Sequence, residues 1–127
     1  MIYLDTSVAL AYLIGETRVP SPALWKETLV SSRLLEYELW TQVHTRKLTA
    51  SHGDAVRTLL GEVSMIELHP HVLARALEPF PVPVRTLEAL HLASIEFVRR
   101  QDRALALASY DDRLVRAARG LGIRLYR

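Results

Sequence analysis

Short apolar runs alternate along the chain with longer segments of helical periodicity. Five apolar runs predict β-strands, at residues 2–4, 29–30, 65–68, 104–108 and 123–126. The spacing of apolar positions predicts helices at residues 7–14, 33–47, 51–63, 71–77, 85–100 and 111–121, with a helical turn at 23–27. Strands that alternate with helices favour an α/β fold with a central, mainly parallel sheet and helices on both faces.

Proline and glycine residues mark the breaks in this pattern. The segment 79–83 reads Pro-Phe-Pro-Val-Pro, which excludes both a helix and a central strand. Gly120 and Gly122 stand where the end of a helix and a turn need them, and Ser51 is expected to cap the helix at 51–63. No repeat or linker divides the chain, so we predict a single domain over residues 1–127.

The composition limits the chemistry. A chain of 127 residues and 14.4 kDa has the size of one ordinary domain. It contains no cysteine, which excludes disulfides, zinc–thiolate sites, iron–sulfur clusters and a cysteine nucleophile. No apolar run approaches the ~18 residues of a membrane span, and the N-terminal residues lack the basic start of a signal peptide. We therefore expect a cytoplasmic protein with no membrane partner.

The net charge of +2 is unevenly distributed. Residues 1–98 carry eight Lys or Arg and eleven Asp or Glu, a balance of −3, whereas residues 99–127 carry eight Arg and three Asp, a balance of +5. A basic C-terminal segment suits a partner that carries phosphate, although on charge alone a solvated helix face is the simpler interpretation.

Three aspartates follow predicted strands. Ligands of open parallel sheets bind beyond the carboxyl ends of the strands, so residues at these ends are the first candidates for a site. Asp5 ends the first strand, and Asp111 and Asp112 follow the fourth. Each of them is also explained as a helix N-cap, a position that Asp favours.

Two glutamates on predicted helices add to these candidates. Glu88 shares a helix face with His91 among apolar and small residues, so its carboxylate needs a cation, a donor or a metal once buried. A first-turn role against the helix dipole is the alternative. Glu38 has no basic residue three or four positions away, whereas Glu36 can pair with Arg33. We therefore prefer Glu38 as the inward-facing acid.

Carboxylates that converge repel one another and stay ionised together only with a divalent cation. Oxygen ligands alone favour Mg²⁺ or Mn²⁺ over zinc, and such clusters support metal-assisted attack of water on a phosphodiester. Other hydrolases fit less well: Ser7 stands where a dehalogenase-type phosphatase needs its second Asp, and neither a P-loop nor a G-x-S-x-G elbow is present. The histidines show no ligand spacing, and we interpret His91 as a packed helix residue.

Four segments together resemble the PIN-domain ribonucleases, in particular the VapC-type toxins of bacterial toxin–antitoxin pairs. They are IYLDTS at 2–7, SSRLLEYEL at 31–39, RTLEALHLA at 85–93 and SYDDRLVRAARGLGI at 109–123. Each segment alone is weakly specific, but their order and separation are specific together. The resemblance runs over nearly the whole chain.

The resemblance implies a PIN-like three-layer α/β/α sandwich that acts as a Mg²⁺-dependent or Mn²⁺-dependent endoribonuclease toxin. The catalytic acids that it implies are, in order, Asp5, Glu38, Glu88 and Asp111. Of these, Asp5, Glu88 and Asp111 would hold the metal, and either Asp5 or Asp111 is the candidate general base. Hydroxyl hydrogen bonds from Thr6 and Ser109 would support the acids.

Two positions depart from the family's usual pattern. The third acid is usually Asp in a TLDALHLA-like context, and Glu88 carries its carboxylate about 1.5 Å further out. Thr41 stands where relatives often have a basic residue. The alternative that Glu88 raises is a degenerate PIN module that binds RNA or a protein partner without cleaving.

The resemblance also implies partners. Members of the family form homodimers and are neutralised by a cognate antitoxin protein. Arg113 and Arg116 in the basic tail would contact phosphates of the RNA substrate. A homodimer agrees with the high apolar content, because Trp25, Trp40 and Tyr37 belong to segments that need not all reach one core.

Overall fold

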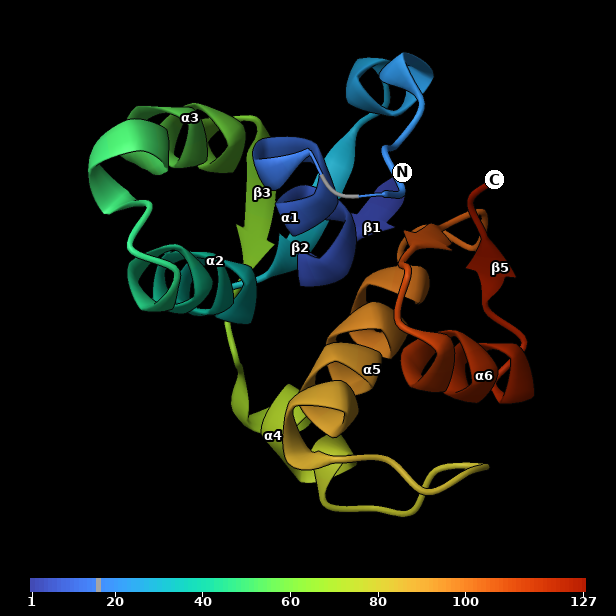
Figure 1. Ribbon diagram of the computed structural model, residues 1–127. Coiled ribbons are helices and arrows are strands. Elements are labelled where there is room, and N and C mark those ends of the chain that lie inside the picture. Colours follow the sequence, from blue (N-terminus) through green and yellow to red (C-terminus); the bar gives the residue numbers. More distant parts are fainter. Residues whose placement is uncertain (16) are drawn as a thin grey trace.

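A computed structural model describes residues 1–15 and 17–127 (Figure 1). Within these residues five strands form one sheet in which every neighbouring pair is parallel, in the order β3-β2-β1-β4-β5. The strands are β1 (Ile2–Leu4), β2 (Leu29–Ser32), β3 (Val63–Ile66), β4 (Ala106–Ala108) and β5 (Arg124–Leu125). The prediction of a central parallel sheet is confirmed.

The connections between the strands are helical. The described residues form α1 (Thr6–Ile14), the 3-10 helix η1 (Pro22–Lys26), α2 (Leu34–Thr45), α3 (Thr49–Gly61), α4 (Pro70–Ala76), α5 (Thr86–Arg99) and α6 (Asp112–Gly120). The order of the elements therefore agrees with the sequence pattern. Over the part of the chain that the structure describes, no helix is both long and apolar enough to cross a membrane.

Several predicted boundaries are wrong: β2 continues past residue 30 to Ser32, β3 begins at Val63, where the sequence predicts the end of a helix, and β5 is limited to Arg124–Leu125. Three further differences have a local reason. The third α-helix begins at Thr49 with Leu48 at its N-cap, so Ser51 lies inside the helix and donates its hydroxyl to the Leu48 carbonyl instead of capping. Strand β3 ends at Ile66 because its partner β2 ends at the opposite residue. Strand β4 begins only at Ala106, because β1 offers no partner before Ile2.

Side chains alternate across β1 and divide the core into two layers. Ile2 and Leu4 pack on one face of the sheet with α1, η1, α2 and α3, whereas Tyr3 packs on the other face with α5 and α6. Figure 1 shows these two groups of helices on either side of the strands, with α4 against α5. The predicted three-layer α/β/α sandwich is confirmed.

The strand order places a switch point beside β1. The chain builds outward from β1 to β2 and β3, then crosses over to β4 and β5 on the other side. At the carboxyl ends of the two central strands Leu4 lies opposite Ala108, and the Asp5 N–H donates to the Ala108 carbonyl at 3.0 Å. Ligand crevices of open parallel sheets lie at such a point, so the fold itself locates the candidate site.

Gly122 has a φ of 72°, as the predicted turn requires, whereas Gly120 is needed for a different reason. Gly120 is the last residue of α6, and a Cβ at this position would lie 2.8 Å from the Cβ of Pro81. The last helix therefore packs against the proline-rich segment at a distance that only glycine permits.

We expect Gly120→Ala to lower the free energy of unfolding by about 1–3 kcal/mol, because the added methyl overpacks this contact. Urea denaturation measures the effect. Gly61→Ala at the end of α3 is the matched control, since a Cβ there meets no atom within 4 Å. It should leave stability unchanged or raise it by up to about 1 kcal/mol, and equal losses in the two variants would contradict the contact.

Candidate functional site

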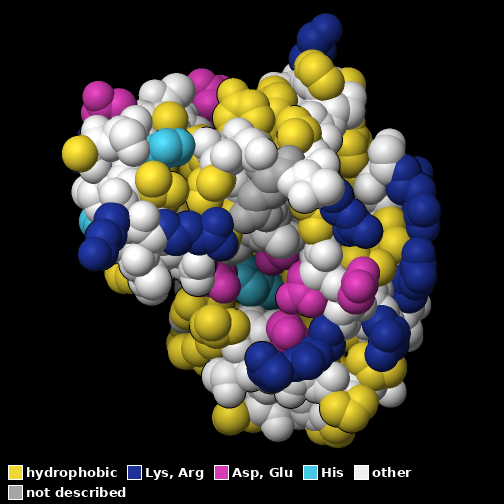
Figure 2. Space-filling view, viewed as in Figure 1, with side chains coloured by type: hydrophobic (Ala, Val, Ile, Leu, Met, Phe, Trp, Pro, Cys, Tyr) yellow, Lys and Arg dark blue, Asp and Glu magenta, His cyan; other side chains and the backbone are white. Residues whose placement is uncertain are grey.

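The four predicted acids line one pocket at the carboxyl edge of the sheet. This acid pocket, of about 410 Å³, is bordered by Asp5, Glu38, Glu88 and Asp111, together with His91 and residues at the start of α5. Figure 2 shows acidic side chains gathered around a hollow in the surface, with Lys and Arg side chains beside it. The expectation that these carboxylates come together is confirmed.

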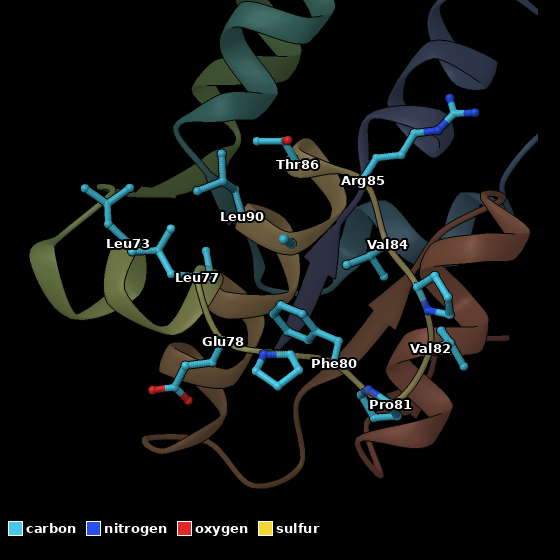
Figure 3. Close-up of a pocket in the computed structure, with 14 residues that line it drawn as sticks. Leu73, Leu77, Glu78, Phe80, Pro81, Val82, Val84, Arg85, Thr86 and Leu90 are labelled. Atoms are coloured by element: carbon cyan, nitrogen blue, oxygen red, sulfur yellow. The ribbon is translucent and has the colours of Figure 1, made fainter.

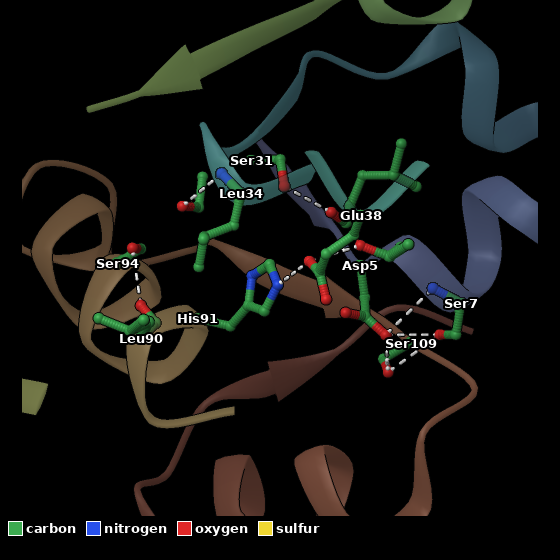
Figure 4. A network of polar contacts seen from close by, with 12 residues as sticks. Asp5, Ser7, Ser31, Leu34, Glu38, Leu90, His91, Ser94 and Ser109 are labelled. Carbon is green, nitrogen blue, oxygen red and sulfur yellow. Dashed lines mark hydrogen bonds and ion pairs between the residues drawn. The ribbon is translucent and has the colours of Figure 1, made fainter. Parts of the chain in front are cut away.

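Asp5 is both a helix cap and a pocket residue. It ends β1, is 5% exposed, and caps α1 by accepting the Ser7 N–H through Oδ2. The same oxygen accepts the hydroxyls of Ser7 and Ser109, the latter at 2.8 Å (Figure 4). No described residue donates to Oδ1. The hydrogen bond expected from Ser109 is present, whereas the contribution of Ser7 was missed from the sequence.

Asp111 is anchored at the next strand end in a similar way. Its Oδ1 caps α6 by accepting the N–H groups of Arg113 and Leu114 at 3.0 and 3.3 Å, while no described residue donates to Oδ2. Asp112 is exposed and borders neighbouring pockets rather than the acid pocket. Of the two adjacent aspartates, Asp111 is therefore the one placed at the site.

Glu38 reaches the pocket from α2. Its Oε1 accepts the Thr6 hydroxyl at 2.8 Å and contacts His91 Nε2 at 2.6 Å. The Glu38 side chain is 23% exposed, against 39% for Glu36, which pairs with Arg33 at 2.9 Å. The preference for Glu38 as the inward-facing acid is confirmed, and so is the predicted hydrogen bond from Thr6.

His91 is packed in the core, as the sequence predicts, but it is also the partner of Glu38. Burial by itself lowers the pKa of His91. The hydrogen bond to Glu38 and the negative charges of Glu38, Asp5 and Asp111 outweigh burial, so the pKa is raised above its ordinary value. The direction of this pKa shift reflects the negative electrostatic potential of the three carboxylates at this end of the sheet. The one sequence signal was its position on the same face of α5 as Glu88.

Tyr3 lies directly behind His91. Its ring is fully buried, and its hydroxyl is 2.8 Å from His91 Nδ1 and accepts the Ser32 N–H at 3.1 Å. Burial, followed by the charge of Asp5, raises the pKa of the Tyr3 hydroxyl. The phenol therefore remains protonated and acts only as a hydrogen-bonding group.

Glu88 closes the first turn of α5 as well as facing the pocket. Its Oε1 accepts the backbone N–H of Arg85 at 2.9 Å, and its Oε2 is 3.8 Å from a guanidinium nitrogen of Arg113. The side chain is 15% exposed. The helix-terminus role that the sequence left open is thus present, and the carboxylate borders the acid pocket at the same time.

The donor chemistry of the pocket fits a hard cation. Among the described residues no three His, Asp or Glu side chains already form a metal-binding group. Mg²⁺ does not require one, because it usually keeps several waters and binds proteins through one or two carboxylates. Oxygens without a hydrogen bond from described residues are available on Asp5, Glu38 and Asp111.

A second pocket of about 420 Å³ forms a basic rim next to the acids. Its arginines are Arg85, Arg113 and Arg116, and it shares Glu88 and Asp111 with the acid pocket. The positions predicted for phosphate contacts, Arg113 and Arg116, are therefore beside the carboxylates rather than on a remote face.

Comparison with known proteins agrees with this arrangement. The sequence model of the PIN domain matches residues 2–120. The chain belongs to the PIN-domain family. This PIN domain is 30% identical over 129 residues to Ribonuclease VapC47 of Mycobacterium tuberculosis, covering 96% of the chain and 93% of VapC47. It is 29% identical over 129 residues to Ribonuclease VapC35 of the same species, covering 97% of this chain and 93% of VapC35.

Solved structures share the fold of the PIN domain. A chain in a toxin–antitoxin complex from Klebsiella pneumoniae superposes with a TM-score of 0.70 at 15% identity, covering 94% of both chains. Mycobacterium tuberculosis VapC20, described as a sarcin–ricin loop cleaving toxin, superposes with a TM-score of 0.69 at 19% identity, covering 92% of this chain and 95% of VapC20. The resemblance to VapC-type PIN domains found in the sequence is confirmed.

The surroundings of His91 make stability depend on pH. Because the folded-state pKa is raised, the protonated imidazole stabilises the fold below the ordinary value of 6.5, and this stabilisation is lost as the pH rises through the folded-state pKa. We expect the free energy of unfolding of the wild type to exceed that of His91→Gln at pH 6.5, and we expect this excess to decrease as the pH is raised. Denaturation at a series of pH values measures it. His69→Gln, at an exposed site, is the control, and an excess that grows with pH would contradict the assignment.

Proposed function

We propose that this PIN domain is an endoribonuclease that hydrolyses RNA phosphodiester bonds with Mg²⁺ or Mn²⁺, as the toxin of a type II toxin–antitoxin pair. The observation that carries the proposal is the set of Asp5, Glu38 and Asp111, each anchored through one oxygen around one pocket. Similarity to two proteins named ribonucleases supports RNA as the substrate. Such an enzyme would act on cellular RNA in the cytoplasm.

Asp5, Asp111 and Glu88 are the residues that would hold the ion. The two aspartates stand at the ends of neighbouring strands, and Glu88 faces them from the first turn of α5. When bound, Mg²⁺ or Mn²⁺ would lower the pKa of a water molecule and offset the charge of the phosphate.

The protein side chains supply orientation and proton transfer. Oε2 of Glu38 can accept a hydrogen bond from the attacking water and so orient its oxygen toward phosphorus. As the bond between this water oxygen and phosphorus forms, the bond from phosphorus to the leaving sugar oxygen breaks. The water proton passes to the carboxylate of Asp5 or Asp111, and the leaving oxygen takes up a proton from solvent water. Arg85, Arg113 and Arg116 would hold flanking phosphates along the basic rim.

A homodimer and an antitoxin are part of the same proposal. Trp25 and Trp40 pack against their own core, so they do not supply the surplus apolar surface expected from the sequence. Other side chains do: Tyr37 is 65% and Leu87 47% exposed beside the acids, and Leu77 is 89% exposed. These surfaces, and the antitoxin complex of one structural relative, support the two partners.

The apolar surface continues into a pocket of about 680 Å³ between α4, the proline-rich segment and the start of α5. Figure 3 shows Leu73, Leu77, Phe80 and Leu90 around it. Arg85 and Thr86 line this pocket and the acid pocket as well, so the two pockets adjoin. An apolar surface of this kind next to the acid pocket suits a protein partner that also covers the carboxylates.

Removing the charge of Glu38 tests the enzyme directly. We expect the wild type to cut RNA with Mg²⁺ or Mn²⁺, EDTA to stop cleavage, and Glu38→Gln to lower kcat by about 100-fold or more, because the pocket loses the carboxylate that orients water. Cleavage of labelled RNA, resolved on gels, measures the rate.

Glu36→Gln is the matched control, since it makes the same change on the same helix at a residue paired with Arg33. It should leave the rate unchanged. If the wild-type protein binds RNA but cuts none with either metal, the proposed enzyme function is wrong, and the alternative of a non-cleaving PIN module takes its place.

Two substitutions at Glu88 separate its two contacts. Glu88→Gln keeps an acceptor for the Arg85 N–H but removes the charge, and Glu88→Asp keeps the charge but is shorter. We expect both to lower cleavage, and the Gln variant also to lose part of the rise in Tm that Mn²⁺ gives the wild type. Undiminished cleavage by Glu88→Gln would leave Glu88 with a helix-terminus role alone, worth about 0.3–1 kcal/mol.

A further inference from the structure

A buried chain of polar groups leads from the sheet to Glu38. The Ser32 N–H donates to the Tyr3 hydroxyl at 3.1 Å, and this hydroxyl contacts His91 Nδ1 at 2.8 Å. His91 Nε2 in turn contacts Glu38 Oε1 at 2.6 Å (Figure 4). Tyr3 is completely buried and His91 is 3% exposed. The groups come from β2, β1, α5 and α2, so the chain connects both helical layers through the sheet.

The direction of these hydrogen bonds follows from their chemistry. The Ser32 N–H can only donate, which leaves the Tyr3 O–H able to donate to His91 Nδ1. A neutral imidazole that accepts at Nδ1 carries its proton on Nε2, and a charged imidazole carries a proton there as well. In both states Nε2–H donates to the Glu38 carboxylate. The remaining tautomer would place two acceptors 2.6 Å apart.

We propose that His91 is a positioning residue for the ribonuclease reaction, held by Tyr3 and acting through Glu38. This inference rests on the proposed function. His91 and Thr6 fix Oε1 from α5 and α1, so Oε2 is the oxygen left to face the pocket. Both ring nitrogens of His91 are already engaged, so the ring has no donor or acceptor left for a substrate.

Two donors are needed because one does not orient a carboxylate. A single hydrogen bond from Thr6 fixes a distance but lets the group rotate about its C–C bond, whereas a second donor from another helix fixes its plane. Partners that orient a functional side chain in this way typically contribute about 10–100-fold to activity when they are removed.

Two amide substitutions at His91 differ in which contact they keep. The side-chain nitrogen of Gln reaches the position of Nε2 and can still donate to Glu38, whereas that of Asn reaches only the position of Nδ1, next to Tyr3. We expect His91→Gln to retain kcat within about 10-fold, and His91→Asn to lower it by about 10–100-fold more, with little change in KM.

Tm values of the two variants separate positioning from stability. If His91 had only a structural role, the activity of each variant would follow its Tm and would not depend on whether the new side chain reaches Glu38. An Asn variant as active as the Gln variant, or a loss confined to KM, would overturn the proposal.

Nitrogen-15 NMR of the metal-free wild type tests the same contact without catalysis. Nε2 of His91 should carry a proton, and its resonance should move in Glu38→Gln but not in the control Glu36→Gln. An unprotonated Nε2, or a resonance indifferent to Glu38, would overturn the proposal. If the wild type cuts no RNA, the proposed function fails, and this spectrum still decides whether His91 holds Glu38.

Discussion

Mutual repulsion of carboxylates at the ends of β1 and β4 is the constraint on which this structure depends. Acids placed together away from bulk water are destabilising unless donors hold them. Asp5 and Asp111 meet this requirement at helix N-termini, where backbone N–H groups and the helix dipole favour negative charge. Glu38, in the middle of α2, has no such terminus and relies on side-chain donors from Thr6 and His91.

One consequence is that the same acid can anchor a helix and belong to the candidate site, so a structural role does not exclude a functional one. Each anchored acid uses one oxygen to accept protein hydrogen bonds, the other oxygen has no donor among the described residues, and each residue borders the acid pocket. The caps of Asp5 and Asp111 lie at the starts of α1 and α6, beside the switch point of the sheet, whereas the donors to Glu38 come from α1 and α5. The packing of the two layers therefore sets the spacing of the acids. A residue such as Asp5 therefore contributes to the start of α1 and to the site with the same carboxyl group.

The parts of this arrangement that follow from local sequence could be predicted. Apolar runs indicate the strands, strand ends indicate Asp5 and Asp111, and Arg33 three residues before Glu36 separates it from Glu38. The hydrogen bond between Glu38 and His91 joins residues 53 positions apart on different layers, so no local pattern contains it. Strand limits at β3 and β4 likewise depend on the length of the neighbouring strand rather than on hydrophobicity.

Glu88, at the position where the family usually has Asp, also accepts a hydrogen bond at a helix N-terminus while bordering the acid pocket, but it does so from inside the helix. The helix α5 follows a proline-rich segment and has Arg85 at its N-cap, whose side chain offers no acceptor. The cap must then come from the third helical residue, and a Glu there has the length to reach back to the Arg85 N–H. Oε1 is thereby anchored and Oε2 remains toward Arg113 and the acid pocket. The longer side chain thus supplies to α5 what Asp5 and Asp111 supply to α1 and α6: one oxygen for the helix terminus and one for the pocket.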